Sequence, residues 1–283
     1  MNQAVEAFVV LLIVANGIFS FRGFGDRLFL DRHVFHVEKI IGEREAHRLV
    51  TSAFLHANIA HFAFNMFALY SFSRGVGAAF GIIKFVFIYF GSLIAGSLLA
   101  LYIHRDHPDY RALGASGAVS GVIFSSIVLY PHGSIGILFL PMGIPSWLFG
   151  ILFVAASIYG IRSGVGNTGH EAHLGGAIAG VLISVILAPA LLLVRPLLVL
   201  GVLVPAVAFL FLVVRRPDLV AVSRIDPEQL RGGREMRARS DRRRMRSELD
   251  GLLDKVGREG IGGLSDRERK RLHELSTELR KNR

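Results

Sequence analysis

The sequence contains no cysteine, which excludes disulfide bonds, thiolate metal sites and a cysteine nucleophile. Charged residues are also scarce: they make up 19% of the 283 residues, against about 25% in ordinary soluble domains, while 52% are apolar. Over residues 112–161, fifty consecutive positions hold no Asp, Glu, Lys or Arg. Since a membrane-spanning helix needs only about 20 apolar residues, the composition predicts a membrane protein with several spans.

Charge-free runs mark the expected spans. The fifty-residue run must fold back once, and the turn-forming residues from Pro131 to Ser134 provide the place for it. The expected spans are Ala7–Phe21, Leu49–Ser73, Phe85–His104, two helices within 112–161, Ala172–Val194 and Pro196–Val214. The predicted fold is therefore all-α, a polytopic membrane helix bundle with a six-span core (1–192), a seventh C-terminal span (193–214) and a basic polar tail (215–283).

The tail carries most of the net charge of +10. It holds 20 Lys and Arg against 13 Asp and Glu, whereas residues 1–214 hold 12 against 9. Beside a membrane, such a segment favours attraction to anionic lipid headgroups, at about 1 kcal/mol per well-placed Lys or Arg, over nucleic-acid binding. An unknown protein partner is the other expectation. Two short helices are expected in the tail, the second opened by a capping box of Ser265 and Glu268.

A few polar residues lie in or beside the predicted spans, where such groups are costly and therefore functional candidates. His61 and Asn65 are four residues apart and share one helix face. Ser116 begins the fourth span and His173 the sixth. A serine hydroxyl becomes a nucleophile when a base removes its proton, and imidazole is the usual base near neutral pH. If these spans pack together, the two residues lie at one membrane depth.

Helix packing is the alternative explanation for each motif taken singly. Gly114, Gly117, Gly176 and Gly180 let helices approach closely, which needs no chemistry at Ser116 or His173. We therefore expect these glycines to pack the fourth span against the sixth. Such packing and a serine–histidine pair are compatible, because the glycines bring the two polar residues toward each other.

Three motifs in order carry a family resemblance: His61-Phe62-Ala63-Phe64-Asn65, then Gly114-Ala115-Ser116-Gly117, then Ala172-His173-Leu174-Gly175-Gly176. Together they resemble the rhomboid intramembrane serine proteases of the bacterial type, over roughly residues 5–192. The resemblance implies that Ser116 is the nucleophile and His173 the general base. It also implies that His61 and Asn65 donate hydrogen bonds to the oxyanion.

The resemblance further implies cleavage of transmembrane segments of other membrane proteins, without cofactor or metal, in the plasma (inner) membrane of a bacterium. The glycine-rich loop 162–170 would act as a cap and the fifth span as a lateral gate. Two positions depart from the family pattern. His47 stands where the family commonly has tryptophan, and Ser120 replaces an aromatic residue that stacks on the catalytic imidazole, so another group must orient His173.

Two other functions remain open. An inactive rhomboid-like protein would only bind membrane helices. An intramembrane metalloprotease is suggested by His170-Glu171-Ala172-His173, but the histidines are three apart rather than the four of HExxH. Glu171 is the acid nearest to His173, and its position two residues earlier on a helix predicts that it points away from the base.

Overall fold

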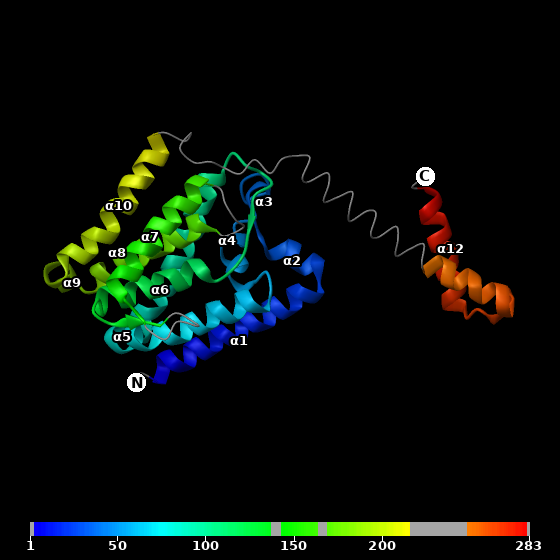
Figure 1. Cartoon of the computed structure of the whole chain (residues 1–283), viewed down its shortest axis with the longest axis horizontal. Helices are drawn as coiled ribbons and strands as arrows, with labels where there is room; N and C mark the ends of the chain where they lie inside the picture. The colour runs from blue at the N-terminus through cyan, green and yellow to red at the C-terminus, as the bar shows by residue number, and fades with distance from the viewer. Residues whose placement is uncertain (1–2, 137–142, 164–168, 216–247, 282–283) are drawn as a thin grey trace. The chain divides into compact units, whose positions relative to one another are not determined.

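The computed structural model describes residues 3–136, 143–163, 169–215 and 248–281, and most of them are helical (Figure 1). The chain divides into two compact units, Met1–Ser223 and Arg224–Arg283. Described in order, the helices of the first unit are α1 (Gln3–Gly25), α2 (Arg27–His33), α3 (Val37–Ile41), α4 (Arg48–Thr51), the short 3-10 helix η1 (Ser52–Phe54), α5 (Ile59–His104), α6 (Ser116–Leu129), α7 (Ser146–Ser163), α8 (His170–Leu187), α9 (Ala190–Val194) and α10 (Pro196–Arg215).

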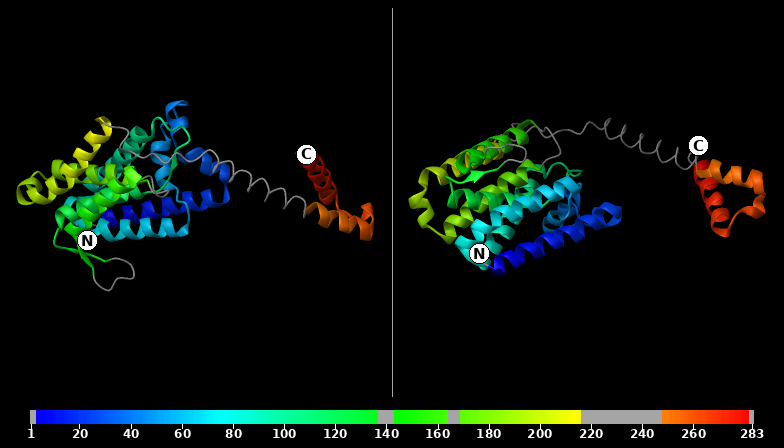
Figure 2. Two further views of the ribbon diagram at one scale, coloured as in Figure 1. Left: turned by 45° about the horizontal axis from the view of Figure 1, so that its top comes forward. Right: turned by 60° about the horizontal axis from the view of Figure 1, so that its bottom comes forward.

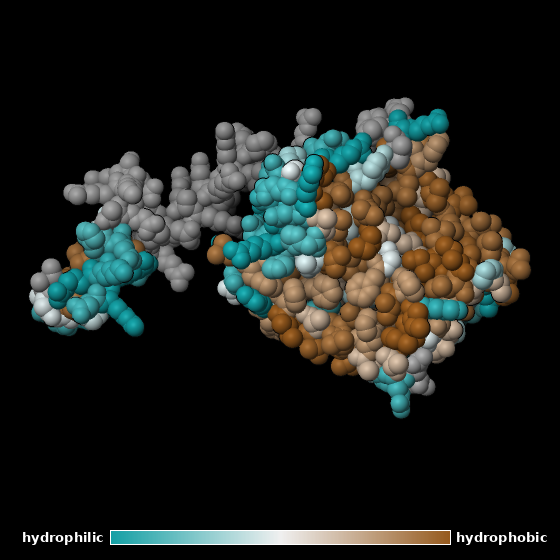
Figure 3. All heavy atoms as spheres, turned by 180° about the vertical axis from the view of Figure 1, so that it is seen from behind, coloured by the Kyte–Doolittle hydropathy of each residue, from teal (hydrophilic) through white to brown (hydrophobic). Residues whose placement is uncertain are grey.

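The exterior of the first unit is apolar, as a bilayer requires. Five helices are long and apolar enough to cross a membrane: α1, α5, α7, α8 and α10. Many large apolar side chains on these helices are exposed, among them Leu197 at 88% and Ile186 at 73%. Figure 3 shows such residues covering most of one face of the helical body, with the largest group of hydrophilic residues at one end of that face. A soluble protein rarely exposes so continuous an apolar surface, which confirms the predicted polytopic helix bundle.

The second and third predicted spans form one 46-residue element, α5, with a sharp reversal at Gly81. Gly81 has φ 72° and ψ 177°, a conformation that favours glycine. Its first half pairs with α1, since Gly77 meets Val5, and its second half runs back along α8, since Gly96 meets Ala172. The predicted start of the second span at Leu49 is wrong, because α4, η1 and a loop precede the helix, which begins at Ile59.

The charge-free run of fifty residues folds back as predicted, but with more structure in the turn. Pro131 follows α6, and a two-stranded hairpin of β3 (Ser134–Ile135) and β4 (Ile144–Pro145) leads into α7. Helix α6 has 14 residues, which rise about 21 Å and fall short of the roughly 30 Å hydrocarbon core. Its start, at Ser116, is therefore expected to lie within the membrane rather than at its surface.

The predicted sixth span is interrupted. The backbone leaves the helix at Ala188, before Pro189, and the short helix α9 follows. Helix α10 then spans Pro196–Arg215, one residue longer than the predicted seventh span and with Pro205 inside it. Proline explains the first break, because the residue preceding it is driven out of the helical conformation.

The segment between α1 and α5 is ordered by a buried arginine. Arg48 is 4% exposed, and its Nη1 donates hydrogen bonds to the carbonyl oxygens of Asp31 at 2.6 Å and Val34 at 2.9 Å. Nearby, β1 (Phe35–His36) pairs with β2 (Arg111–Ala112), which joins this segment to the loop before α6. Arg48 thus anchors the segment although His47 stands where tryptophan was expected.

The centre of the bundle is a glycine-mediated contact of α5, α6 and α8, which lie side by side in both views of Figure 2. A Cβ added at Gly176 would lie 2.7 Å from the carbonyl carbon of Gly117, and one added at Gly180 would lie 2.6 Å from Gly121 Cα. Because these contacts keep the same order along both helices, α6 and α8 run parallel. The expected packing of the fourth and sixth spans is therefore present at Gly117, Gly176 and Gly180.

The second unit, in its described part, contains a helix over 248–259, a 3-10 turn (Ile261–Gly263) and α12 (Asp266–Lys281). The first helix continues through Gly257. The capping box is formed: Ser265 N donates to Glu268 Oε2 at 2.8 Å, and Glu268 N donates to Ser265 Oγ at 3.4 Å. Ion pairs from Lys255 to Glu268 and from Arg271 to Glu248 link the two helices.

Candidate active site

The starts of three helices meet at one end of the bundle. Helices α5 and α6 run in the same direction, because Gly114 lies beside His61 near their starts and Gly75 meets Tyr130 at the far end. Helix α8 is parallel to α6, so its first turn reaches the same end. This arrangement gathers the predicted residues His61, Asn65, Ser116 and His173 from three separate segments.

Ser116 and His173 are brought together through their chain neighbours. A Cβ added at Gly117 would lie 3.3 Å from the carbonyl oxygen of Ala172. Ser116 is the first residue of α6 and is half-buried, as is His173 in the first turn of α8. Both residues lie in the described chain, and there the Ser116 hydroxyl makes no hydrogen bond to His173. Catalytic hydrogen bonds are often long in structures without substrate.

Gly114 lies before α6 rather than on its packing face. Its φ of +128° is a conformation that side chains rarely adopt, and its N–H donates to Ser52 O at 3.0 Å. A Cβ here would lie 2.8 Å from His61 Cε1 and 3.7 Å from Ser116 Oγ. The His61 ring and the Ser116 hydroxyl therefore flank one point of the backbone.

His61 and Asn65 have hydrogen-bond donors to spare. The N–H of Ala57 donates to His61 Nδ1 at 3.4 Å, which assigns the ring hydrogen to Nε2. Asn58 caps α5 by accepting from His61 N at 2.8 Å. The Asn65 side-chain amide donates to His61 O at 2.9 Å, so its second N–H is free to bond elsewhere. The unpaired N–H of Ser116 at a helix N-terminus is a further donor.

His56 extends the site toward α1. It is 2% exposed, and its Nδ1 lies 2.9 Å from Ser20 Oγ. The Ser20 hydroxyl in turn donates to Phe54 O at 3.0 Å. The His56 and His61 rings meet edge to face with centroids 5.0 Å apart. His56 therefore supports one side of His61.

An aromatic neighbour of His173 comes from α7. The Phe153 ring centroid lies 6.0 Å from that of His173 at an interplanar angle of 37°. Phe153 also packs against Phe124 and Phe149. Ser120, where the family often has an aromatic residue, is buried at 3% exposure. The sequence contained no signal for Phe153, which is one of 21 phenylalanines.

Glu171 points away from His173, as predicted, and enters a buried cluster. Its Oε1 lies 3.0 Å from His104 Nε2, and its Oε2 accepts from the Tyr110 hydroxyl at 3.4 Å. The His104 and Tyr110 rings stack with centroids 3.5 Å apart and planes 8° from parallel. Within the described ranges, no three His, Asp or Glu side chains are grouped to hold a metal ion.

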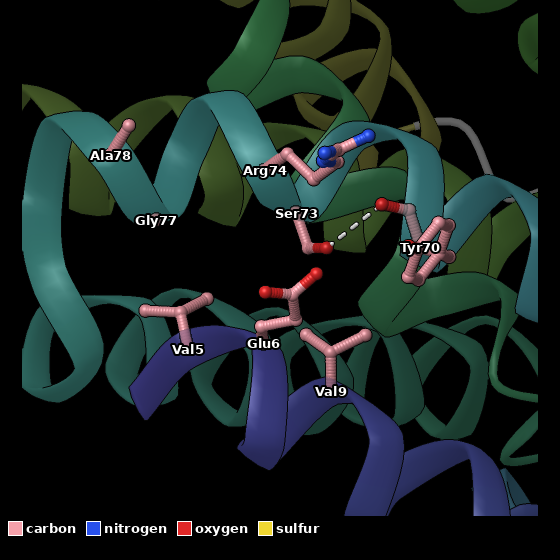
Figure 4. Close-up of a pocket in the computed structure, with 8 residues that line it drawn as sticks. All are labelled: Val5, Glu6, Val9, Tyr70, Ser73, Arg74, Gly77 and Ala78. Carbon is pink, nitrogen blue, oxygen red and sulfur yellow. Dashed lines mark hydrogen bonds between the residues drawn. The ribbon is translucent and has the colours of Figure 1, made fainter. Parts of the chain in front are cut away.

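A small pocket lies elsewhere, between α1 and the first half of α5 (Figure 4). Glu6 of α1 points toward Ser73 of α5 there. Because residues near Gly75 lie at the far end of α6, this pocket is remote from Ser116. Residues 164–168 of the expected cap loop lie outside the described residues.

Comparison with known proteins decides the family. Residues 43–190, more than half of the chain, match a profile described as "Rhomboid domain". The chain belongs to the rhomboid family. Its helical membrane bundle is a rhomboid bundle, and residues 235–278 match a second profile, a family of unknown function (DUF6576).

Rhomboid relatives occur in several organisms. RHOMBOID-like protein 12, mitochondrial, of Arabidopsis thaliana is 31% identical over 60% of this chain and 55% of that protein. Rhomboid protein 1, mitochondrial, of Saccharomyces cerevisiae is 35% identical over 47% of this chain and 40% of that protein. Rhomboid protease GluP of Bacillus subtilis is 33% identical over 50% of this chain and 26% of that protein. The chain thus matches about half or less of each relative's length.

Proposed function

We propose that this rhomboid is an intramembrane serine endopeptidase that cleaves transmembrane segments of membrane proteins by a Ser116–His173 dyad. The observation that carries the proposal is the contact of Gly117 with Ala172, the chain neighbours of the two residues. This contact keeps the starts of α6 and α8 at the same level of the bundle. The similarity to Rhomboid protease GluP supports the same reaction class.

The chemistry follows from the residue types. His173 takes the proton from Ser116 Oγ as the oxygen attacks the scissile carbonyl, and then gives it to the leaving amine. The oxyanion accepts from His61 Nε2–H, the free Asn65 N–H and the Ser116 N–H, whose helix dipole favours negative charge. Water then hydrolyses the acyl-enzyme, with His173 again as base.

The substrate must unwind before cleavage, because a peptide bond within a helix is sheltered by its own hydrogen bonding. Helix α7 serves as the lateral gate and loop 162–170 as the cap. The six-span core (1–192) carries this reaction, while the seventh span (193–214) and the tail (215–283) lie outside the catalytic machinery. The tail binds anionic lipid or a protein partner.

Reconstitution with a labelled transmembrane substrate tests the proposal. Wild type should cleave it, Ser116→Ala and His173→Ala should each abolish cleavage, and a chelator should have no effect. Chelator sensitivity would favour the metalloprotease. Cleavage that survives in Ser116→Ala would contradict the dyad.

An inactive, helix-binding rhomboid is the second candidate, favoured by the missing hydrogen bond between Ser116 and His173 in the described chain. It predicts no cleavage by wild type but equal substrate capture by wild type and Ser116→Ala.

For the membrane of residence we propose a bacterial plasma membrane; of the three relatives named above, one is from Bacillus subtilis and two are mitochondrial proteins. Fractionation of the source cell tests it.

A further inference from the structure

The cluster of Glu171, His104 and Tyr110 joins the two chain segments that carry the proposed nucleophile and base. Tyr110 lies in the loop that runs on to Ser116, and Glu171 lies two residues before His173. His104 ends α5 and contacts both of the other side chains. Their contacts therefore connect the start of α8 to the approach to α6.

The cluster is buried although its members are ionisable. His104 is 5% exposed and Glu171 is 7% exposed. Burial, and next the negative charge of Glu171, raise the pKa of the Tyr110 hydroxyl, which therefore stays protonated and donates to the carboxylate. A buried carboxylate needs such partners, so the position of Glu171 is tied to theirs.

Apolar and backbone contacts hold the cluster in place. Tyr110 packs edge to face against Phe35, and its carbonyl accepts from Val37 N at 3.2 Å. Ala172, between Glu171 and His173, packs on a small apolar core that includes Phe35 and Val37. Displacement of Glu171 would therefore move the first turn of α8 relative to the loop before α6.

We propose that Glu171, His104 and Tyr110 form a positioning clamp that sets the placement of His173 relative to Ser116. The clamp touches neither the substrate nor the reacting atoms. It rests on the proposed function, since it positions the residues of that dyad.

The test measures acylation of Ser116 by a fluorophosphonate probe in the full chain, together with kcat and KM on a transmembrane substrate. Glu171→Ala should slow acylation at least tenfold and lower kcat with KM unchanged. Glu171→Gln, which keeps the shape and an acceptor for Tyr110, should recover part of the rate. Because the residues act as one unit, adding His104→Ala to Glu171→Ala should slow acylation no further.

Arg111→Ala is the matched control. Arg111 is next to Tyr110 but forms an exposed ion pair with Asp31 at 2.7 Å, so its removal should change acylation less than twofold. The clamp is overturned if Glu171→Ala and Glu171→Gln acylate like Arg111→Ala, or if the effects of Glu171→Ala and His104→Ala multiply. Absence of Ser116 labelling in wild type would instead overturn the proposed function, and the clamp with it.

Discussion

Gly114 is a residue whose backbone conformation bears directly on the proposed oxyanion donors. At φ +128°, an added methyl group would be strained and would lie 2.8 Å from His61 Cε1. Since the loss of one dominant oxyanion donor lowers kcat by about 10²–10³, Gly114→Ala should reduce cleavage by up to that factor. Rates on the reconstituted substrate measure it.

Gly25→Ala is the control for Gly114→Ala, because nothing lies within 4 Å of a Cβ added at Gly25. Its activity should equal that of wild type. Similar rates in the two variants would show that the His61 ring does not serve the reaction.

Phe153 should hold the His173 ring in place of an aromatic residue at position 120. Because small misplacements of catalytic groups lower rates by up to about 100-fold, Phe153→Ala should slow acylation of Ser116 by roughly ten- to 100-fold. Phe87→Ala, which removes a phenylalanine that is 62% exposed on α5, should leave it unchanged. Equal acylation rates in Phe153→Ala and Phe87→Ala would mean that Phe153 only fills space in the core and does not hold the His173 ring.

Residue-level prediction from the sequence depended on local motifs. Ser116, His173, His61 and Asn65 were singled out because each stands in a short pattern within an apolar run. The structure brings their segments together, and their catalytic roles stay predictions. Phe153 and the partners of Glu171 carried no local signal. His104 and Tyr110 lie more than 60 residues before Glu171 in the chain, so only the packing of α5 on α8 brings them together.

At the scale of elements, the contact of α6 and α8 leaves no room for side chains. A Cβ added at Gly180 would lie 2.6 Å from Gly121 Cα, against backbone that cannot rotate away. Gly180→Ala should therefore lower the free energy of unfolding by about 1–3 kcal/mol, as overpacked positions do. Denaturant unfolding in detergent measures it.

Gly201→Ala in α10 should instead raise the free energy of unfolding. Nothing lies within 4 Å of its added Cβ, and alanine favours helix over glycine by up to about 1 kcal/mol. Equal destabilisation by both substitutions would contradict the close α6–α8 contact.

The capping box of α12 predicts a pH dependence in the tail. Hydrogen bonds from Lys255 first, and then from Ser265, lower the pKa of Glu268 from 4.5 to about 2. A lowered pKa stabilises the folded form above pH 4.5, and this stabilisation disappears as the pH falls through about 2. Amide hydrogen exchange in α12 of the full chain, corrected for intrinsic rates, should therefore quicken between pH 4.5 and 2.

Glu268→Gln should remove this pH dependence, whereas Asp250→Asn, at an exposed position of the preceding helix, should retain it. If the pH dependence survives in Glu268→Gln, it arises from another titrating group.

Element boundaries were predictable only in part. Hydropathy located the spans but did not separate α4 and η1 from α5, because residues 49–73 contain no charged side chain. The break before Pro189 and the hairpin of β3 and β4 were also missed. Short elements of this kind depend on tertiary contacts, such as the pairing of Ser134 with Pro145, that periodicity does not encode.

At the scale of the whole molecule, all four proposed catalytic residues lie in the first compact unit. Deletion of residues 216–283, which leaves α10 complete, should therefore change acylation of Ser116 less than twofold. If the basic tail binds anionic lipid, the same deletion should weaken cleavage only in vesicles that contain such lipid. A loss of acylation in detergent would instead make the tail part of the catalytic unit.

The direct backbone contact of α6 with α8 also has a consequence for the surrounding lipid. Helices α7 and α10 expose large side chains to the bilayer, whereas the glycines of α6 and α8 meet inside the bundle. A change in acyl-chain length or lateral pressure would act first on those outer helices and leave the spacing of Ser116 and His173 nearly constant. Bilayer thickness should therefore govern how fast a substrate reaches the site, while the rate of bond cleavage after its arrival stays the same.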